Sequence, residues 1–484
     1  MSVRRWALLA AAASASACLL ALAHPGCGGD QGGSTEYTEA GASGSSADAT
    51  KGSGGGPGGS DASGGTAGVG GIVDSGSASD GSTTDGAACP PVAPPPNVPA
   101  GWVETTPHDC DCRIYVPASA DQLPPPIEWE PCPTESLQNV NCRIMKATSA
   151  GQSVTYPSPL FSAAHNSSAP MLLFGRDNLG GDPEFFMRVI AEVDGPAHVA
   201  LLRAGPQAKS CGLIGTGFAE GMYAFNIVRN GTTGRGMLAG SVDSLQPSIV
   251  QAVPDNQPSS FDVSSVWLLR RRLGPYSVAA WDNTSTEVIY DPAQDPDGLA
   301  AHESQVVGGD VFFNVNVGGL SGTMAWSKAA GLGPLLRWYG DPNRASGDFG
   351  TDGKDMVWTY GEGQLPGLYQ YSKLSVMTAP YTLDPAKAQA GAKRLRSDPM
   401  TFLPFPYKVG CGFASRAVAN DQDGASLLVV RLSDGTSWML KPKDPMSYPL
   451  TAIGVTCDEV FFADPANRVG RVRLDSMGPG TPPD

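Results

Sequence analysis

The chain has 484 residues, with 47 acidic against 32 basic side chains and a formal net charge of −15. The tract 28–88 carries −7 of this charge and the first residues carry +2, so residues 89–484 carry −10. Phosphate and anionic-lipid surfaces are bound by clustered Lys and Arg, so this balance excludes nucleic acid as an expected partner. The one basic cluster, Arg270 to Arg272, is followed by Gly274 and Pro275 and is interpreted as a solvated turn.

Residues 1–26 have the pattern of an export signal. Arg4 and Arg5 precede an uncharged apolar stretch that runs from Trp6 to Ala23. The run from Ala23 to Cys27 resembles the lipobox of bacterial lipoproteins, with His24 where that family has Leu. The resemblance implies lipidation at Cys27, and so a protein anchored to the outer membrane. Cleavage after Ala23 by an ordinary signal peptidase, followed by free release into the periplasm or outside the cell, is the alternative.

Residues 27–88 are expected to be a disordered linker. They are Gly, Ser, Ala, Thr and Asp with very few large apolar side chains, and cannot bury enough surface to offset the entropy of ordering. A flexible coil of this length spans roughly 40 to 45 Å, enough to hold a domain clear of a membrane. No later stretch approaches the roughly 20 apolar residues of a spanning helix.

Residues 89–145 form a Cys- and Pro-rich segment that is expected to be braced by disulfides. Besides Cys18 and Cys27 the chain has eight cysteines, an even number that can pair completely in an oxidising compartment. The disulfide candidates are Cys411, Cys457, Cys132 and Cys142, and Cys411 with Cys457 is the expected pair because both precede successive strand signals. Eight cysteines allow 105 patterns, so the remaining connectivity stays open.

Residues 146–484 contain a short apolar strand signal that recurs seven times. Counted from their first apolar residues, the successive gaps are 51, 44, 45, 46, 60 and 43 residues, which is the length of one four-stranded propeller blade. The signals begin at Met171, Met222, Val266, Val311, Val357, Ala417 and Val460.

A second strand signal follows four of these anchors after about 10 to 13 residues, and Gly, Pro, Asn and Asp fill the intervals, as antiparallel hairpins require. Helical periodicity is confined to one short stretch near Asp384 to Arg396. The repeat resembles β-propellers as a class and implies an all-β fold of about seven four-stranded blades. Tandem β-sandwiches are the alternative. The last repeat is short, so closing the ring needs a strand donated from upstream, either Cys142–Met145 or 152–156.

No catalytic, cofactor or metal residue can be assigned. Nucleophile-elbow, Ser-x-x-Lys and His-Glu-x-x-His motifs are missing from the sequence. The run from His108 to Cys112 is attributed to disulfides rather than to a metal, because the chain is exported. Gly215, Gly217 and Gly221 are attributed to a tight turn rather than to a phosphate loop.

Three further groups of side chains are weaker candidates for metal binding, catalysis or ligand binding. Asx-rich loops at 291–298 and 420–424 could hold calcium, although such loops also form ordinary turns. The acids before several anchors, Asp310, Asp355 and Asp458 with Glu459, are interpreted as turn caps because they recur. The tryptophans in the strand signals, Trp267, Trp281, Trp326 and Trp358, are attributed to packing between blades.

These observations predict a monomeric binding or scaffold module that takes an unknown protein or glycan ligand. The alternative is an extracellular propeller hydrolase or lyase that acts on glycans or lactones, with carboxylates in the channel.

Overall fold

The structure is a computed structural model. It describes residues 98–105, 113–133, 137, 140–146, 160–162, 169–177, 186–204, 211–229, 233–251, 260–271, 275–281, 286–295, 300–317, 320–337, 344–364, 371–397, 406–420, 424–442, 450–464 and 468–483. The predicted signal peptide, Cys27, the linker 27–88 and the run from His108 to Cys112 lie outside these residues.

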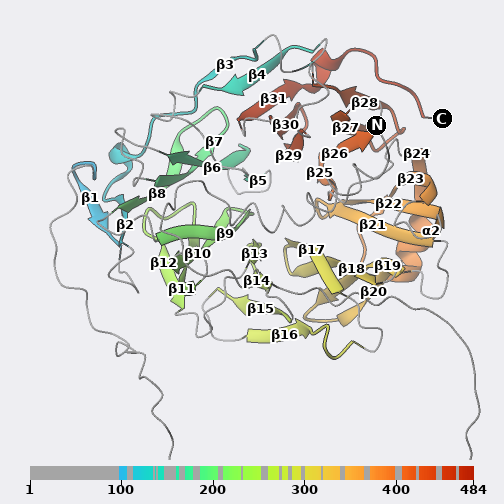
Figure 1. Ribbon diagram of the computed structural model, residues 1–484, viewed down its shortest axis with the longest axis horizontal. Helices are drawn as coiled ribbons and strands as arrows, with labels where there is room; N and C mark the ends of the chain where they lie inside the picture. The colour runs from blue at the N-terminus through green and yellow to red at the C-terminus, as the bar shows by residue number, and fades with distance from the viewer. Residues whose placement is uncertain are drawn as a thin grey trace, which may run out of the picture. The chain divides into compact units, whose positions relative to one another are not determined.

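The described strands form seven antiparallel sheets arranged in a ring, so the chain is a seven-bladed β-propeller (Figure 1). The alternative of tandem β-sandwiches is therefore wrong. Blade 1 consists of β5 (Leu160–Ser162), β6 (Met171–Asp177), β7 (Phe186–Glu192) and β8 (Ala197–Ala204), extended by β2 (Arg113–Pro117) and β1 (Trp102–Glu104). Blade 2 consists of β9 (Cys211–Ala219), β10 (Met222–Arg229), β11 (Thr233–Ser241) and β12 (Ser248–Gln251). Blade 3 consists of β13 (Ser260–Val263), β14 (Trp267–Arg271), β15 (Tyr276–Ala280) and β16 (Thr286–Tyr290).

The remaining blades have the same plan. Blade 4 consists of β17 (Ala300–Val307), β18 (Asp310–Val317), β19 (Leu320–Ser327) and β20 (Gly331–Arg337). Blade 5 consists of β21 (Arg344–Thr351), β22 (Asp355–Gln364), β23 (Tyr371–Pro380) and β24 (Lys393–Ser397). Blade 6 consists of β25 (Lys408–Gly410), β26 (Phe413–Asn420), β27 (Gly424–Arg431) and β28 (Ser437–Leu440). Blade 7 consists of β29 (Thr451–Val455), β30 (Glu459–Ala463), β31 (Val469–Arg473), β4 (Cys142–Met145) and β3 (Trp129–Pro131).

Each recurring apolar signal forms the second strand of a blade. This strand is apolar throughout because the neighbouring blades cover both of its faces. In β18, Phe312 packs with Phe349 and Trp358 of blade 5, whereas its neighbour Phe313 packs with Tyr276 of blade 3. Successive side chains point to opposite faces of a strand, so burial on both faces gives a continuous apolar run.

The hydrophobic core of the described residues is divided into seven clusters, and each lies between two adjacent blades. Trp267 of blade 3 and Trp326 of blade 4 meet edge to face with their ring centroids 5.8 Å apart. The Trp267 indole Nε1 also donates to the carbonyl of Gly309 in blade 4 over 3.1 Å. The attribution of these side chains to packing between blades is confirmed, and no blade has a core of its own.

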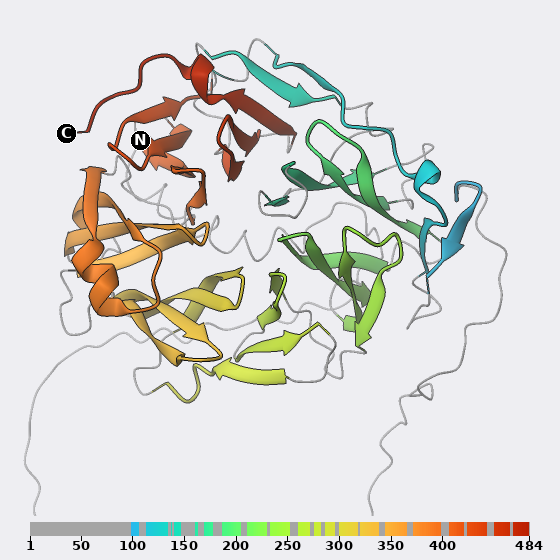
Figure 2. The same cartoon turned by 180° about the vertical axis from the view of Figure 1, so that it is seen from behind.

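The ring is closed by a strand from the Cys-rich segment (Figure 2). β4 pairs antiparallel with β31, with Ile144 opposite Gly470 and Cys142 opposite Val472. The first of the two expected closing strands is thus confirmed, and residues 152–156 lie outside the described residues. β1 and β2 extend blade 1 in the same way, so the described strands of the Cys- and Pro-rich segment, β1 to β4, belong to propeller sheets.

Glycine allows the innermost strands to approach one another closely. A Cβ on Gly350 of β21 would lie 2.1 Å from the carbonyl oxygen of Tyr407 in the next blade. One on Gly217 of β9 would lie 3.0 Å from the carbonyl oxygen of Phe261 in blade 3. Gly217 therefore lies in a strand, at an interface between blades, and the prediction of a tight turn at Gly215 and Gly217 is wrong.

The predicted short helix is α2 (Pro385–Gly391), which packs against β20 and β23 at the edge of the ring. Asp384 caps it, because its Oδ1 accepts from the backbone nitrogens of Ala386 and Lys387 at 2.9 and 3.3 Å. Two single 3-10 turns, η1 (Ala120–Gln122) and η4 (Leu474–Met477), are also present. None of the helices in the described part of the chain is both long enough and apolar enough to cross a membrane.

Candidate functional site

A cavity of about 420 Å³ lies between the blades, and its wall includes the innermost strands of blades 2 to 7. Its walls carry both apolar and charged side chains. The charged ones on the inner strands include Asp262 of β13, Glu303 of β17 and Lys408 at the start of β25. These are positions on rigid, paired strands, so the groups are held in place before any ligand arrives.

Two of the inner strands carry an acid on a β-bulge. The register of β17 against β18 shifts between His302 and Ser304, so Glu303 is an extra residue. The register of β21 against β22 shifts between Gly347 and Gly350, a stretch that contains Asp348. Glu303 has φ 46° and Asp348 has φ 55°, a region that costs a non-glycine residue about 1 to 2 kcal/mol. Strain of this kind in adjacent blades marks the wall as a candidate site.

Asp348 and Arg416 form the more deeply buried of two ion pairs beside the cavity. We call the charged side chains of this region the charged cluster; its members are Asp262, Arg271, Glu303, Asp348, Lys408 and Arg416. Nη1 of Arg416, on β26, lies 2.5 Å from Oδ2 of Asp348, and the Arg416 side chain is fully buried. The same nitrogen donates to Oγ1 of Thr359 over 2.7 Å, and the guanidinium lies 4.7 Å from the centre of the Tyr407 ring. These contacts join blade 5 to blade 6.

A second ion pair joins Asp262 to Arg271, with Nε of Arg271 3.2 Å from Oδ2 of Asp262. Ser304 of blade 4 also donates a hydrogen bond to the Asp262 carboxylate. Arg270, the neighbour of Arg271 on β14, is buried. The interpretation of this basic cluster as a solvated turn is therefore wrong for both residues: β14 continues through them because Arg271 finds its counter-charge on the adjacent inner strand. Arg272 lies outside the described residues.

Glu303 is a carboxyl that its surroundings keep protonated. Burial raises the pKa of Glu303 to about 8, and the charge of Asp348 adds to this, whereas Asn314, Lys408 and Arg271 act to lower it. Nδ2 of Asn314 donates to Oε2 of Glu303 over 3.0 Å. Thr323 donates to Oδ1 of the same amide over 3.1 Å, which fixes the direction in which Asn314 points its nitrogen.

Lys408 is the cation of the cluster that lacks a partner. Within the described residues its ammonium makes neither a hydrogen bond nor an ion pair, and the side chain lines the cavity. Burial lowers the pKa of Lys408, and the charges of Asp262 and Glu303 act in the opposite direction. Lys408 and Glu303 therefore feel each other's charge without touching.

The acids that precede the strand signals do not gather in this cluster, and their side chains do not cap their own turns. Asp310 accepts a hydrogen bond from the hydroxyl of Tyr381 in the next blade. Glu459 lies 3.3 Å from Nη1 of Arg471 on β31. The turn before Asp355 is capped by Asp352, whose Oδ1 accepts from the Asp355 nitrogen over 2.9 Å. Their interpretation as caps is corrected accordingly.

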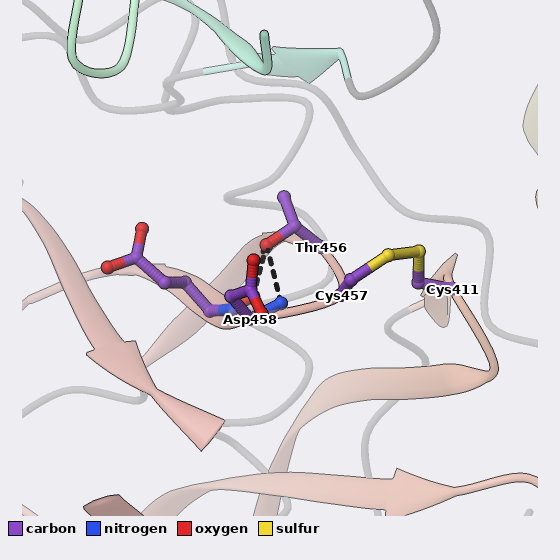
Figure 3. The surroundings of a disulfide bond; sticks show 5 residues. Cys411, Thr456, Cys457 and Asp458 are labelled. Atoms are coloured by element: carbon purple, nitrogen blue, oxygen red, sulfur yellow. Dashed lines mark hydrogen bonds between the residues drawn. A yellow bond between two sulfur atoms is a disulfide. The ribbon is translucent and has the colours of Figure 1, made fainter. Parts of the chain in front are cut away.

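Two cysteine pairs lie at disulfide distance. Cys132 and Cys142 join β3 to β4 with their Cα atoms 5.4 Å apart. Cys411 and Cys457 have Cα atoms 4.9 Å apart and join the inner hairpin turns of blades 6 and 7 (Figure 3). Beside Cys457, Oγ1 of Thr456 accepts from the backbone nitrogen of Asp458 over 3.3 Å.

The structure gives no support to metal ligation at the described part of the Asx-rich loops. Oδ1 of Asp291 accepts from the Ala293 nitrogen over 3.0 Å, and Oδ2 of Asp295 accepts from the Tyr290 hydroxyl over 3.0 Å. Asp297 and residues 421–423 lie outside the described residues. Among the described residues, no group of three or more His, Cys, Asp or Glu side chains could hold a metal ion.

Comparison with known proteins bears on the fold alone. No family model and no curated protein matches the chain. Among solved structures, a prolyl endopeptidase is 11% identical with a TM-score of 0.40, and the matched region covers 74% of this chain and 56% of the endopeptidase chain. The β-propeller domain of the Trilobed protease from Pyrococcus furiosus is 9% identical with a TM-score of 0.39, covering 66% and 92%. TolB from Acinetobacter baumannii is 10% identical with a TM-score of 0.31, covering 60% and 77%. The chain thus spans little more than half of the prolyl endopeptidase.

The sequence-based search did not find the charged cluster. Its members come from four blades and are separated by up to about 150 residues, and none of them lies in a recognisable motif. One sequence signal points to the cluster: a charged residue within a short segment rich in Gly and Ser, such as Asp348 after Gly347.

Proposed function

We propose that this protein is an exported, lipid-anchored β-propeller that binds a ligand in its central cavity. The proposal combines the lipobox-like run ending in Cys27, the 27–88 linker and the charged wall of the cavity. Small-molecule sites are concave, largely preformed and mostly apolar, with a few fixed polar groups, and roughly 300 to 1,000 Å³ in volume. The cavity of about 420 Å³ has this character.

The observation that carries the binding role is the set of partly buried charges on the inner strands. Removing a charged side chain from water costs several kcal/mol. We therefore expect a charged residue at such a position only where ion pairing offsets this cost or where the charge has a function. Asp262 and Asp348 form ion pairs with Arg271 and Arg416, whereas Lys408 makes no ion pair within the described residues and is acted on by Asp262 and Glu303 only at a distance. A ligand group is the partner we assign to it.

The anchor is tested by metabolic labelling with a fatty-acid probe. The full-length chain should be labelled, Cys27→Ser should not be, and Cys18→Ser, which removes a cysteine of the signal segment, should be labelled normally. Equal labelling of the wild type and Cys27→Ser would contradict lipidation.

The binding role is tested by thermal shift of the purified mature chain against a panel of monosaccharides, organic acids and short peptides. At least one compound should raise the melting temperature of the wild type and have less effect on Asp262→Asn and Lys408→Met. If the active compounds act equally on the wild type and both variants, the ligand does not bind in the cavity.

A second candidate function is hydrolysis or cleavage of a glycan or lactone, and Glu303 is the observation that favours it. A carboxyl with a raised pKa beside other carboxylates is the arrangement that general acid catalysis uses. Turnover of glycan or lactone substrates that disappears in Glu303→Gln would support this activity, and turnover that survives the substitution would contradict a role for Glu303.

A further inference from the structure

Residues 478–483 lie against β28, the outermost strand of blade 6, after the chain has left blade 7 through β31 and the turn η4 (Figure 1). Ser437 of β28 pairs with Thr481 through two backbone hydrogen bonds, 2.9 Å from the Ser437 nitrogen and 2.8 Å from the Thr481 nitrogen. The indole Nε1 of Trp438 donates to the carbonyl of Gly478 over 3.0 Å. The segment thus adds one antiparallel bridge to the outer edge of blade 6.

We propose that this edge of blade 6 is a docking site for a short extended peptide that contains glycine and proline, and that residues 478–483 are its occupant within the chain. A peptide of the same chemistry from another molecule takes the site when residues 478–483 leave it. The site is independent of the proposed cavity ligand, because inner strands line the cavity whereas β28 is the outermost strand of its blade.

Two glycines give the site its selectivity. A Cβ on Gly480 would lie 2.4 Å from Cγ2 of Thr436 and 2.8 Å from Cε2 of Trp438, so the peptide backbone lies directly against the indole. Gly478 has φ 72° and ψ −168°, a conformation that glycine adopts far more readily than other residues. A segment that binds in this way therefore needs glycine at both positions, two residues apart.

Prolines confine the backbone pairing to Thr481. In an antiparallel ladder the next hydrogen-bonded positions lie two residues to either side. Pro479 and Pro483 occupy these positions, and proline has no N–H to donate. Pro483 still lies close to blade 6, because a Cβ on Gly435 would be 3.3 Å from the Cβ of this proline. The site therefore suits a short proline-containing segment, which is already extended before it binds and loses little entropy.

Trp438 is held in place by its own blade. The guanidinium of Arg431 lies 5.8 Å from the centre of the Trp438 ring, and Asp434 holds that guanidinium through two hydrogen bonds of 3.0 and 2.6 Å. Phe413 of β26 lies on the same indole, with the ring centroids 6.4 Å apart. Because these contacts come from blade 6, the indole stays positioned for a peptide when residues 478–483 are absent.

The segment is held by contacts that another peptide can replace. Thr481 and the three prolines of the segment are exposed, and it is joined to β28 by the two hydrogen bonds of Ser437 and the one of Trp438. Each such bond has a small net contribution, since the same groups bond to water when the segment leaves. Its advantage over a free peptide is its tether, which gives an effective concentration of roughly millimolar order.

The experiment measures the fluorescence anisotropy of a labelled peptide, Gly-Pro-Gly-Thr-Pro-Pro-Asp, with the mature chain and with a chain that ends at Met477. The shortened chain should bind the peptide roughly tenfold more tightly than the full chain, because the tethered competitor is gone. A peptide with alanine in place of its second glycine should bind the shortened chain roughly tenfold more weakly, since its methyl group meets the indole.

Gly480→Ala in the full-length chain tests the same point if the shortened chain does not fold. The new Cβ would collide with Thr436 and Trp438, so residues 478–483 should leave β28 and the labelled peptide should bind as it does to the shortened chain. Gly333→Ala on β20, where a Cβ would meet nothing within 4 Å, is the matched control and should bind the peptide as the wild type does.

The proposal is overturned if the folded variants bind the peptide no more tightly than the wild type, or if the alanine peptide binds as well as the parent peptide. Concentration-dependent dimerisation of the shortened chain without peptide binding would assign this edge to a second copy of the chain and would also overturn it. Size-exclusion chromatography of the shortened chain distinguishes this outcome, and a cooperative melt establishes that each variant is folded.

Discussion

Arg471 of blade 7 holds Asp194 of blade 1 through two hydrogen bonds, of 2.7 and 2.8 Å, across 277 residues of sequence. The arginine side chain is 6% exposed and the aspartate is 66% exposed. The guanidinium also lies 4.3 Å from the centre of the Trp129 ring. This contact spans the seam at which the first and last blades meet.

Substitutions at this seam should have unequal effects. Asp194→Ala should lower the free energy of unfolding by less than about 1 kcal/mol, because its carboxylate is largely solvated. Arg471→Ala should cost about 3 kcal/mol, since it also removes the Trp129 contact and leaves Glu459 without its 3.3 Å partner. Urea denaturation measures both. Arg473→Ala is the control, because its ion pair with Asp475 is exposed, and a cost as large as that of Arg471→Ala would contradict a special role for the seam.

Adding one methyl group to an inner strand should separate blades 5 and 6. Gly350→Ala would place its Cβ 2.1 Å from the Tyr407 carbonyl oxygen, and the backbone must move to relieve this contact. We expect a loss of about 1 to 3 kcal/mol in unfolding free energy. Gly347→Ala, three residues earlier in β21, meets nothing within 4 Å and should be close to neutral. Equal melting temperatures of the two variants would show that the blades are not in contact there.

The two described disulfides should differ in their contribution to stability. In the chain-entropy relation, the 46-residue separation of Cys411 and Cys457 corresponds to about 4 kcal/mol, and the 10-residue separation of Cys132 and Cys142 to about 2.7 kcal/mol. The double serine variant of the first pair should therefore melt at a lower temperature than that of the second. Calorimetric scans of the two variants side by side give the order, and the reverse order would count against the inter-blade link as the stronger constraint.

Stability should depend on pH through Glu303. Its pKa of about 8 in the folded protein lies above the ordinary value of 4.5, so the folded state binds the proton more tightly than the unfolded state does. The stabilisation is fully present below pH 4.5 and is lost as the pH rises through 8.

The measurement is the difference in melting temperature between the wild type and Glu303→Gln, taken from pH 5 to pH 9. Because the charge of Glu303 also acts to raise the pKa of Lys408, the difference reports Glu303 together with its effect on Lys408. The wild type should lose stability relative to the variant as the pH rises. A difference that does not change with pH would mean that Glu303 is ionised throughout.

The fold was predictable because the second strand of every blade is apolar and recurs at the length of one blade. Val311, Phe312 and Phe313 lie on a second strand that is covered by two neighbouring blades, so the strand appears as an uninterrupted apolar run. The shortness of the last repeat also predicted that Cys142–Met145 or 152–156 would complete it.

The site could not be predicted in this way, because the innermost strands face a cavity rather than a core. Glu303 and Asp348 lie at bulges that no hydrophobic period records, and Arg416, the ion-pair partner of Asp348, comes from the next blade. Arg271 was assigned to a turn because its counter-charge, Asp262, lies on the preceding strand of the same hairpin and was given no role in the sequence. Pairing of charges across blades depends on the ring itself, which local sequence does not encode.

The pairing of Cys142 with Val472 sets the order of events during biogenesis. During synthesis β4 is made early, but β31, the strand it must join, is among the last to be made. Until then both edges remain open to other polypeptides, and a chain truncated before Val469 would never conceal them. The growing chain is therefore most vulnerable to aggregation and to proteolysis just before β31 is complete.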